Sequence, residues 1–324
     1  MTHYKIMTDD TKIVKPFPYD IIKKVGEGAF GEVFKAKHHK ISGRIVALKC
    51  EVAEQEPKKN RLQIEYGFYR QLNNNKDYTG IPRIYWYGNS TKLIDPSTSK
   101  PLTRNIMIMD YLGPCLEKLY VYFKRRFSIK TILMIGIQCI ERLEFVHNNG
   151  IIHRDIKPEN FMIGPCNATK SIIYIADFGL SKKYIDFDNY TLNPFRVTNS
   201  FVGTLRFCSM RSHKNLEQGR RDDLESLGNM LIYLFKGSLP WQGVPDDKTG
   251  KKDARSLAIF KIKKNTSLED LCSGCPNIMI DYMQHCRLLR YTEVPNYTYL
   301  KSLFINEISS RGFILDNVFD WHNI

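Results

Sequence analysis

The chain has 324 residues and a mass of 37.8 kDa, more than one small hydrophobic core needs, so we expect one large or two apposed globular lobes. Hydrophobic residues at 43% and charged residues at 25% disfavour a disordered or fibrous chain. The 48 Lys and Arg against 34 Asp and Glu give a net charge of +14, which leaves nucleic acid, anionic membranes, nucleotides and acidic or phosphorylated proteins open as partners.

The apolar segments predict neither a membrane span nor a secretory signal. The longest apolar run, residues 131–140, is far shorter than the ~20 residues that a span requires, and it contains Gln138. Residues 1–12 contain no apolar core region, which favours the cytosol or the nucleus. In such a reducing compartment the eight cysteines are expected to be free thiols.

A cysteine and histidine cluster near the C-terminus resembles zinc-ligand spacing only loosely. It consists of Cys272, Cys275, His285 and Cys286. Adjacent ligands at 285 and 286 would point about 100° apart on a helix, and no second C-x-x-C is present. Free thiols are therefore the better interpretation.

The first hundred residues alternate like strands, with one helix between them. Strands are predicted at 19–25, 33–37, 44–50 and 106–109. The helix is predicted to open near Pro57 and to run to about Leu72. Residues 89–103, rich in Ser, Thr, Lys and Pro, are typical of a loop.

Helical periodicity replaces the strand pattern after Gly113-Pro114. Apolar residues recur at intervals of three and four after Ser128, a plausible N-cap, and Gly150 can end that helix. A small β-rich lobe is therefore followed by a larger, mostly helical one, with the boundary near residues 110–113.

The first chemical motif is Gly26-x-Gly28-x-x-Gly31-x-Val33, which matches G-x-G-x-x-G-x-V. Glycine backbone can approach phosphates where a Cβ would obstruct. A dinucleotide-binding fold would need a helix to begin inside the motif, whereas the residues after Gly31 alternate like a strand. The motif predicts a hairpin over phosphates, with a plain glycine-rich turn as the alternative.

A lysine on the next strand and a carboxylate on the helix form the second motif. Ala47 and Lys49 share one face of their strand, so a cation lies beside a small residue that leaves room for an aromatic base. Glu65 interrupts the apolar side of the predicted helix, where a carboxylate requires a cationic partner. We expect that partner to be Lys49.

The third motif follows the long helix. His153-Arg154-Asp155 and Asn160 match H-R-D-x-x-x-x-N, in which the Asp accepts or orients a substrate hydroxyl and the Asn holds a divalent ion. Lys157 can neutralise charge on a transferring phosphoryl group.

A second carboxylate, Asp177, follows the apolar segment 172–175 in Asp177-Phe-Gly179 and suits Mg²⁺ chelation between nucleotide phosphates. Each short motif alone could be a turn. Their shared order and spacing exclude coincidence.

With these motifs the chain resembles a protein kinase, and several longer segments look like the casein kinase I family. Those segments are 112–119, 220–228, 237–243 and 319–321. The resemblance runs from about residue 19 to the C-terminus. It implies an α+β, bilobal fold with a small antiparallel β-rich N-terminal lobe carrying one helix and a larger, mostly helical C-terminal lobe. The implied divisions are an extension at 1–18 and a kinase domain at 19–324, with lobes at 19–109 and 114–324 and a hinge at 110–113.

The resemblance also implies roles for individual residues. Lys49 would hold the ATP α- and β-phosphates, Glu65 would fix Lys49, and Asp155 would be the catalytic base, assisted by Lys157 and Asn160. Asn160 and Asp177 would bind Mg²⁺. Met109 falls at the gatekeeper position and Asp110 to Leu112 at the adenine-binding hinge. The full ATP-binding set is Val25, Gly26, Gly28, Gly31, Val33, Ala47, Lys49, Glu65, Met109, Asp110 and Leu112.

Two further positions, Asp223 and Arg206, concern the catalytic loop and the substrate. Asp223 resembles a buried helix carboxylate that braces the catalytic loop, with an exposed acid in a charged run as the alternative. Arg206 aligns with an arginine that binds phosphate in relatives, although its partner lysine, Lys251 or Lys252, cannot be aligned.

The chain departs from the family pattern on the peptide-binding side. Arg211 stands where the family has Asn in Ser-Ile-Asn, Leu205 and Cys208 are also different, and residues 244–256 form a longer segment than usual. The Ala-Pro-Glu triplet of most kinases is absent. These departures put the family's substrate preference in question.

We therefore expect a monomeric Ser/Thr kinase that uses ATP and Mg²⁺ on acidic or pre-phosphorylated proteins. Without a long autoinhibitory tail, constitutive activity is expected. Three alternatives stay open: a pseudokinase scaffold, a nucleic-acid binder using basic clusters such as 124–126, 220–221 and 261–264, and a kinase of the tau-tubulin or vaccinia-related branch.

Overall fold

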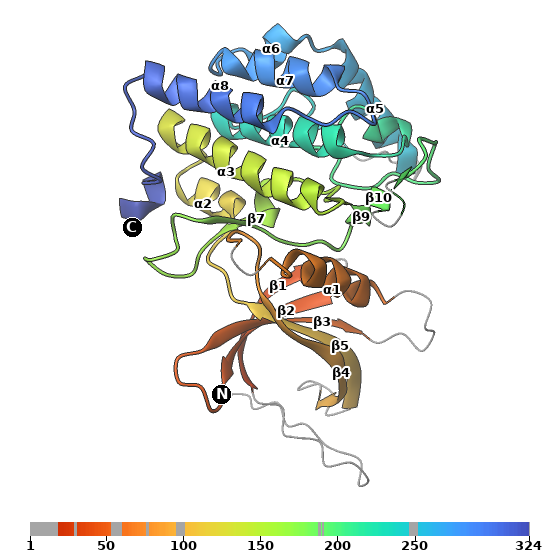
Figure 1. Ribbon diagram of the computed structural model, residues 1–324, viewed down its shortest axis with the longest axis vertical. Coiled ribbons are helices and arrows are strands. Elements are labelled where there is room, and N and C mark those ends of the chain that lie inside the picture. The colour runs from red at the N-terminus through yellow and green to blue at the C-terminus, as the bar shows by residue number, and fades with distance from the viewer. Residues whose placement is uncertain are drawn as a thin grey trace. The chain divides into compact units, whose positions relative to one another are not determined.

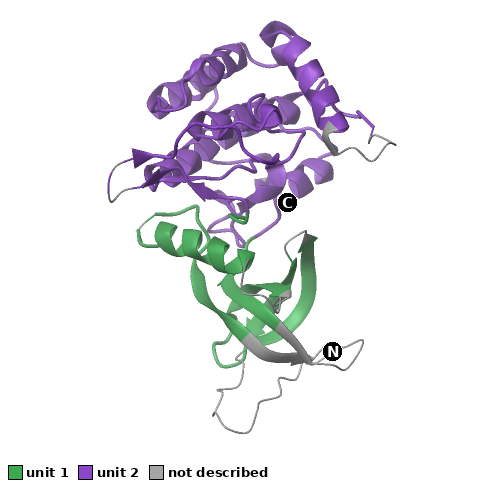
Figure 2. Cartoon of the chain, turned by 90° about the vertical axis from the view of Figure 1, so that its right-hand side faces the viewer, with its two compact units in different colours: residues 1–112, 177–179 green, residues 113–176, 180–324 purple. Residues whose placement is uncertain are grey.

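The computed structural model describes residues 19–28, 31–52, 60–75, 78–94, 101–186, 189, 191–245 and 252–323. The chain divides into two compact units, coloured separately in Figure 2. Unit 1 comprises residues 1–112 together with 177–179, and unit 2 comprises 113–176 and 180–324. The expected extension at 1–18 lies outside the described residues, and so do Ala29, Phe30 and Lys251.

Unit 1 contains a five-stranded antiparallel sheet in the order β1-β2-β3-β5-β4 (Figure 1). Its strands are β1 (Tyr19–Gly28), β2 (Gly31–His38), β3 (Ile45–Val52), β4 (Ile84–Ile94) and β5 (Pro101–Asp110). The predicted glycine-rich hairpin is confirmed, because β1 and β2 pair antiparallel up to Gly28 opposite Gly31.

In unit 1 the predicted helix end at Leu72 is confirmed, whereas the predicted helix start and the predicted loop differ from the structure. Helix α1 is Arg61–Leu72, with Asn60 as its N-cap, so it begins later than Pro57, which lies outside the described residues. The predicted loop at 89–103 is largely strand, since β4 and β5 pair as far as Ile94 opposite Pro101. β4 is an edge strand, and an edge tolerates the polar residues that suggested a loop.

The two faces of this sheet serve different purposes. One face forms a closed core whose buried residues are Phe34, Ala36, Val46, Leu48, Cys50, Ile106 and Ile108. Because side chains alternate along strands, Ala47 and Lys49 lie on the other face, with Met109 opposite Ala47 and Val33 opposite Lys49. Val33, Ala47, Lys49 and Met109, four of the predicted nucleotide-binding residues, therefore share one face, whereas Asp110 is paired with Val46 of the core face.

Unit 2 is mostly helical. Its helices are α2 (Leu116–Tyr122), α3 (Ile129–Asn148), α4 (Arg220–Lys236), α5 (Lys252–Asn265), α6 (Leu268–Cys272), α7 (Ile278–Leu288) and α8 (Tyr297–Ser310). Short strands pair as β6 (Ile151–Ile152) with β9 (Lys182–Lys183), β7 (Phe161–Ile163) with β8 (Ile173–Ile175), and β10 (Ile185–Asp186) with β11 (Thr191–Leu192). Single-turn 3₁₀ helices occupy Pro158–Asn160, Ser212–Lys214 and Asp320–Asn323.

The predicted limits of α3 are confirmed. The Ser128 side chain accepts a hydrogen bond from the Thr131 backbone N–H, which caps the first turn. Gly150 follows the helix with a φ of 73°, the left-handed conformation that ends helices. Helix α3 is buried along most of its length and leads directly into the catalytic-loop motif.

The structure also bears on the predictions about membrane spans and cysteines. Among the described residues, no helix has the length and apolar character that crossing a bilayer demands. The eight cysteines are all free, and the described residues contain no group of three or more His, Cys, Asp or Glu side chains that could hold a metal.

Candidate active site

Unit 1 brings together one lysine and two carboxylates from distant parts of the chain. The Lys49 ammonium donates to both Glu65 carboxylate oxygens and to Asp177 Oδ1, each at 2.8 Å. The side chains of Lys49 and Glu65 are 13% and 2% exposed, whereas Asp177 is 33% exposed. The predicted Lys49–Glu65 pair is confirmed, and Asp177 is the most accessible member of the cluster.

Electrostatics keep Lys49 charged in this buried position. Burial alone would lower the Lys49 pKa, but Glu65 and Asp177 outweigh that effect and raise the pKa above its ordinary value. Lys49 therefore presents a fixed positive charge, the property required to hold phosphate oxygens.

Helix α1 also fixes the segment that carries Asp177. The Asp177 backbone N–H donates to the Tyr69 hydroxyl at 2.9 Å, and the Phe178 ring packs edge-on against Tyr69 at 4.9 Å. Asp177 has a φ of 65°, a left-handed conformation that costs a non-glycine residue free energy and often occurs at functional sites. Tyr69 is buried on the apolar side of α1, and its hydroxyl gives that side a polar contact with the Asp177 backbone.

The glycines of the predicted phosphate loop have different structural roles. Gly31 has a φ of +130°, and a Cβ there would lie 2.0 Å from the Cys50 carbonyl oxygen, so folding itself requires glycine. A Cβ on Gly26 would meet only the Val33 side chain, at 3.7 Å or more, which is ordinary contact. Side-chain packing therefore does not require glycine at position 26, which lies beside a register shift of β1, and its bare backbone is open to a phosphate.

These roles predict opposite outcomes for two alanine substitutions. Gly31→Ala should lower the free energy of unfolding by about 2 kcal/mol or more, since it adds left-handed strain and a backbone clash. Gly26→Ala should change it by less than about 1 kcal/mol and instead raise the KM for ATP. Thermal melting and ATP-dependent kinetics check both; a larger loss of stability for Gly26→Ala than for Gly31→Ala would contradict the assignment.

The remaining nucleotide residues lie at or beside the end of β5. Asp110 accepts hydrogen bonds from the Arg83 backbone N–H at 2.8 Å and from the Tyr85 hydroxyl, so its side chain is used within unit 1. Leu112 is buried, at 7% exposure, and Val25 is half-buried on β1. Unit 1 ends at Leu112, inside the segment predicted as the hinge.

Unit 2 holds the third motif. Asp155 is 6% exposed, and its two oxygens accept from different partners: Oδ1 from the Thr204 hydroxyl at 2.6 Å and Oδ2 from the Lys157 ammonium at 2.6 Å. Asn160 donates from its amide nitrogen to the Asp155 carbonyl oxygen at 2.8 Å. The predicted trio of Asp155, Lys157 and Asn160 is thus assembled around one carboxylate.

Asp223 anchors the backbone that presents Asp155. Its carboxylate accepts from the backbone N–H groups of His153 at 2.7 Å and Arg154 at 2.8 Å, and it lies 3.0 Å from His147 Nε2. Burial alone would raise the Asp223 pKa, but the His147 hydrogen bond and neighbouring groups hold it below its ordinary value. The predicted brace is confirmed.

The family comparison agrees with this geometry. The model of the protein kinase domain matches residues 19–294. The chain belongs to the protein kinase family. As a protein kinase it has the bilobal fold, uses ATP and transfers a phosphoryl group to proteins. The Lys–Glu pair in unit 1 and the Asp–Lys–Asn trio in unit 2 are the parts that this chemistry needs.

Each unit of the kinase supplies one of the predicted ligands of a divalent ion, Asp177 in unit 1 and Asn160 in unit 2. Both predicted ligands supply oxygen, the atom that Mg²⁺ prefers. Asn160 uses its amide nitrogen in hydrogen bonds, so its oxygen keeps its lone pairs for a cation. Asp177 is partly exposed and carries its carboxylate at the Lys49 cluster. Bound metal would neutralise phosphate charge, while Lys49 and Lys157 supply the fixed positive charges.

Arg206 lies on an aromatic surface of unit 2. Its guanidinium carbon is 5.6 Å from the Phe207 ring centre and 5.8 Å from that of Tyr233. Among the described residues, no carboxylate forms an ion pair with Arg206. Of its candidate partners, Lys252 begins α5 and Lys251 lies outside the described residues.

Sequence reasoning missed Thr204 and His147. Thr204 bonds Asp155 across 49 positions of the chain, and no spacing rule connects residues so far apart. His147 lies in the last turn of α3, where a helix-terminal histidine usually faces solvent, yet it is 1% exposed and bridges Asp223 and Tyr297. Only the fold reveals either contact.

Several residues of the basic clusters form hydrogen bonds within unit 2, although Arg125 stays exposed at its surface. Arg125 donates to the Tyr233 hydroxyl, and Arg220 and Arg221 donate to the Thr292 and Leu289 carbonyl oxygens. These contacts disfavour the nucleic-acid alternative for Arg220 and Arg221, which are partly buried.

Proposed function

We propose that this kinase phosphorylates Ser and Thr residues of acidic or pre-phosphorylated proteins, with Mg²⁺ as the metal, and that it is a casein kinase I-like enzyme. The observation that carries the substrate preference is Arg206, whose guanidinium lies over the Phe207 and Tyr233 rings without an ion pair to a described carboxylate, with Glu159 as a nearby charge. Such a group suits a substrate phosphate or carboxylate.

Asp155 supports hydroxyl transfer as the chemistry. Lys157 and Thr204 each donate to a different oxygen of Asp155, and the two hydrogen bonds fix the orientation of the carboxylate. A carboxylate oriented in this way can accept the proton of a substrate hydroxyl. The long casein kinase I-like segments favour aliphatic hydroxyls over the phenol of Tyr as acceptors.

A peptide-library assay tests the proposal. Matched peptides with Ser, Thr or Tyr acceptors, each in unprimed, acidic and phosphoserine-containing forms, are incubated with labelled ATP and Mg²⁺, and casein serves as a protein substrate. We expect transfer to Ser and Thr and the highest kcat/KM on the phosphoserine or acidic peptides. Arg206→Gln should reduce that preference by about tenfold.

Two outcomes would overturn it. A preference for unprimed basic peptides would contradict the role of Arg206. No transfer to any substrate by the wild-type protein would favour the pseudokinase alternative, for which the four groups Lys49, Asp155, Asn160 and Asp177 would be retained without turnover.

A further inference from the structure

Lys263 on α5 is a fully buried lysine. It is 1% exposed, and its ammonium donates to the carbonyl oxygens of Leu205 at 3.0 Å and Cys208 at 2.7 Å, while lying 4.9 Å from the Trp241 ring centre. The neighbouring Lys264 is exposed. The basic cluster 261–264, named from sequence as a possible contact for nucleic acid, therefore includes one lysine that faces inward.

The segment that Lys263 contacts has no helix or strand to satisfy its backbone. Instead, side chains hold four consecutive carbonyl groups of residues 205–208. Leu205 accepts from Lys263, Arg206 from Trp241 Nε1 at 2.7 Å, Phe207 from Asn229 at 2.9 Å, and Cys208 from both Lys263 and Asn229. Because each buried carbonyl requires a donor, these side chains determine the path of the chain.

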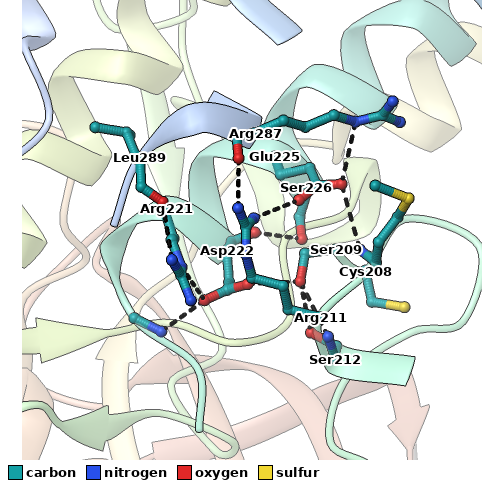
Figure 3. Close-up of polar contacts among 12 residues, drawn as sticks. Cys208, Ser209, Arg211, Ser212, Arg221, Asp222, Glu225, Ser226, Arg287 and Leu289 are labelled. Carbon is teal, nitrogen blue, oxygen red and sulfur yellow. Dashed lines mark hydrogen bonds and ion pairs between the residues drawn. The ribbon is translucent and has the colours of Figure 1, made fainter. Parts of the chain in front are cut away.

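The C-terminal end of the same loop is tied to α4 (Figure 3). The Ser209 hydroxyl donates to Asp222 at 2.7 Å, the Met210 backbone N–H donates to Glu225 at 3.3 Å, and Arg211 forms an ion pair with Glu225 at 3.2 Å. Arg211 also donates to the carbonyl oxygen of Arg287, at the end of α7. Arg211, a departure from the family pattern, is thus an internal anchor.

The N-terminal end of the loop contacts the predicted catalytic carboxylate, Asp155. Thr204 donates to Asp155, and Arg206 extends over Phe207 and Tyr233. The loop 204–211 therefore connects the catalytic carboxylate to the arginine proposed to bind the substrate anion, and Lys263 is bonded to its middle.

Burying an ammonium group among carbonyl groups has a desolvation cost. Stability alone therefore does not explain a lysine at position 263. Burial lowers the Lys263 pKa, partly offset by Cys208 and Glu225, and no described carboxylate forms an ion pair with it. An apolar side chain of similar length would fill the same space without that desolvation cost. It would not, however, hold two carbonyl groups in fixed directions.

We propose that Lys263 is a positioning residue for substrate recognition, fixing the loop 204–211 so that Arg206 meets the substrate anion in one geometry. This inference rests on the proposed preference for acidic or phosphorylated substrates. Arg211 secures the same loop from its other end.

Lys263→Met tests the proposal, with Lys264→Met as the matched control on the same helix. KM and kcat are measured for a phosphoserine-containing peptide, its unphosphorylated counterpart and ATP, together with thermal melting. We expect Lys263→Met to raise the KM for the phosphorylated peptide by about tenfold, with a smaller rise for its counterpart and an ATP KM within about twofold. Lys264→Met should match the wild type.

A second variant covers the case in which Lys263→Met does not fold. Arg211→Asn combined with Glu225→Gln releases the far end of the loop without leaving a buried unpaired carboxylate, and it should shift the same KM ratio in the same direction. An unchanged ratio in a folded variant overturns the inference. If the wild-type enzyme does not distinguish the two peptides, the proposed preference for phosphorylated substrates is refuted. The role of Lys263 is then decided by a different comparison: Lys263→Met should raise the KM for peptide and leave the KM for ATP unchanged.

Discussion

Asp155→Asn should lower kcat for phosphoryl transfer by about 10²–10⁴-fold, the usual contribution of a positioned general base. Asn preserves the shape of the side chain but removes its charge and one of the two acceptor oxygens that now receive Lys157 and Thr204. The site would then neither orient nor deprotonate the substrate hydroxyl. Steady-state kinetics with casein and labelled ATP measure the loss.

Measurements of ATP affinity and of thermal stability distinguish a loss of catalysis from a loss of folded enzyme. Lys49 and Glu65 belong to the other unit, so the affinity for ATP should stay within about twofold of the wild-type value. Asp281→Asn makes the same chemical change at an exposed position of α7 and should leave kcat unaltered. An Asp155→Asn enzyme that keeps a tenth or more of wild-type activity would exclude Asp155 as the base.

Asp223→Asn should be the most damaging substitution for stability among those considered. It leaves the buried backbone donors of His153 and Arg154 with one acceptor oxygen where there were two, and removes the charge that faces His147. Breaking a buried charged network of this kind costs about 3–5 kcal/mol. The melting temperature should fall by roughly 10 °C, and kcat should fall because the backbone before Asp155 loses its support.

The pH dependence provides an independent check. The folded-state pKa of Asp223 is below the ordinary value of 3.8, so its stabilisation is present above that value and is lost as the pH falls through the folded pKa. The stability difference between wild type and Asp223→Asn should therefore be constant near neutral pH and shrink below about pH 4. Equal melting temperatures at pH 7 would contradict the bracing role; Asp281→Asn again serves as the matched control.

The sequence predicted those parts of the site that depend on local pattern. Strand alternation placed Ala47 and Lys49 on one face, and the polar interruption of an apolar helix identified Glu65 as the partner of Lys49. Both inferences use only the spacing of neighbouring residues, which the backbone geometry of strands and helices determines. The limits of α3 followed in the same way from Ser128 and Gly150.

Contacts that depend on tertiary structure were not predictable in this way. The burial of Lys263 could not be distinguished from the exposure of Lys264, because both are lysines of one basic run. The polar edge strand β4 was mistaken for a loop, since composition does not reveal which strand lies at the edge of a sheet. Thr204 reached Asp155 only through the path of the loop 204–211.

The register of β3 links the predicted nucleotide-binding face of the unit 1 sheet to its core. Leu48 belongs to the closed core, and its neighbours Ala47 and Lys49 belong to the binding face. A register shift of one residue would exchange the two sets, placing an ammonium in the core and leucine at the position predicted to hold the phosphates. Insertions or deletions within β3 are therefore excluded by two independent requirements, whereas individual side chains on the binding face can change without disturbing the core.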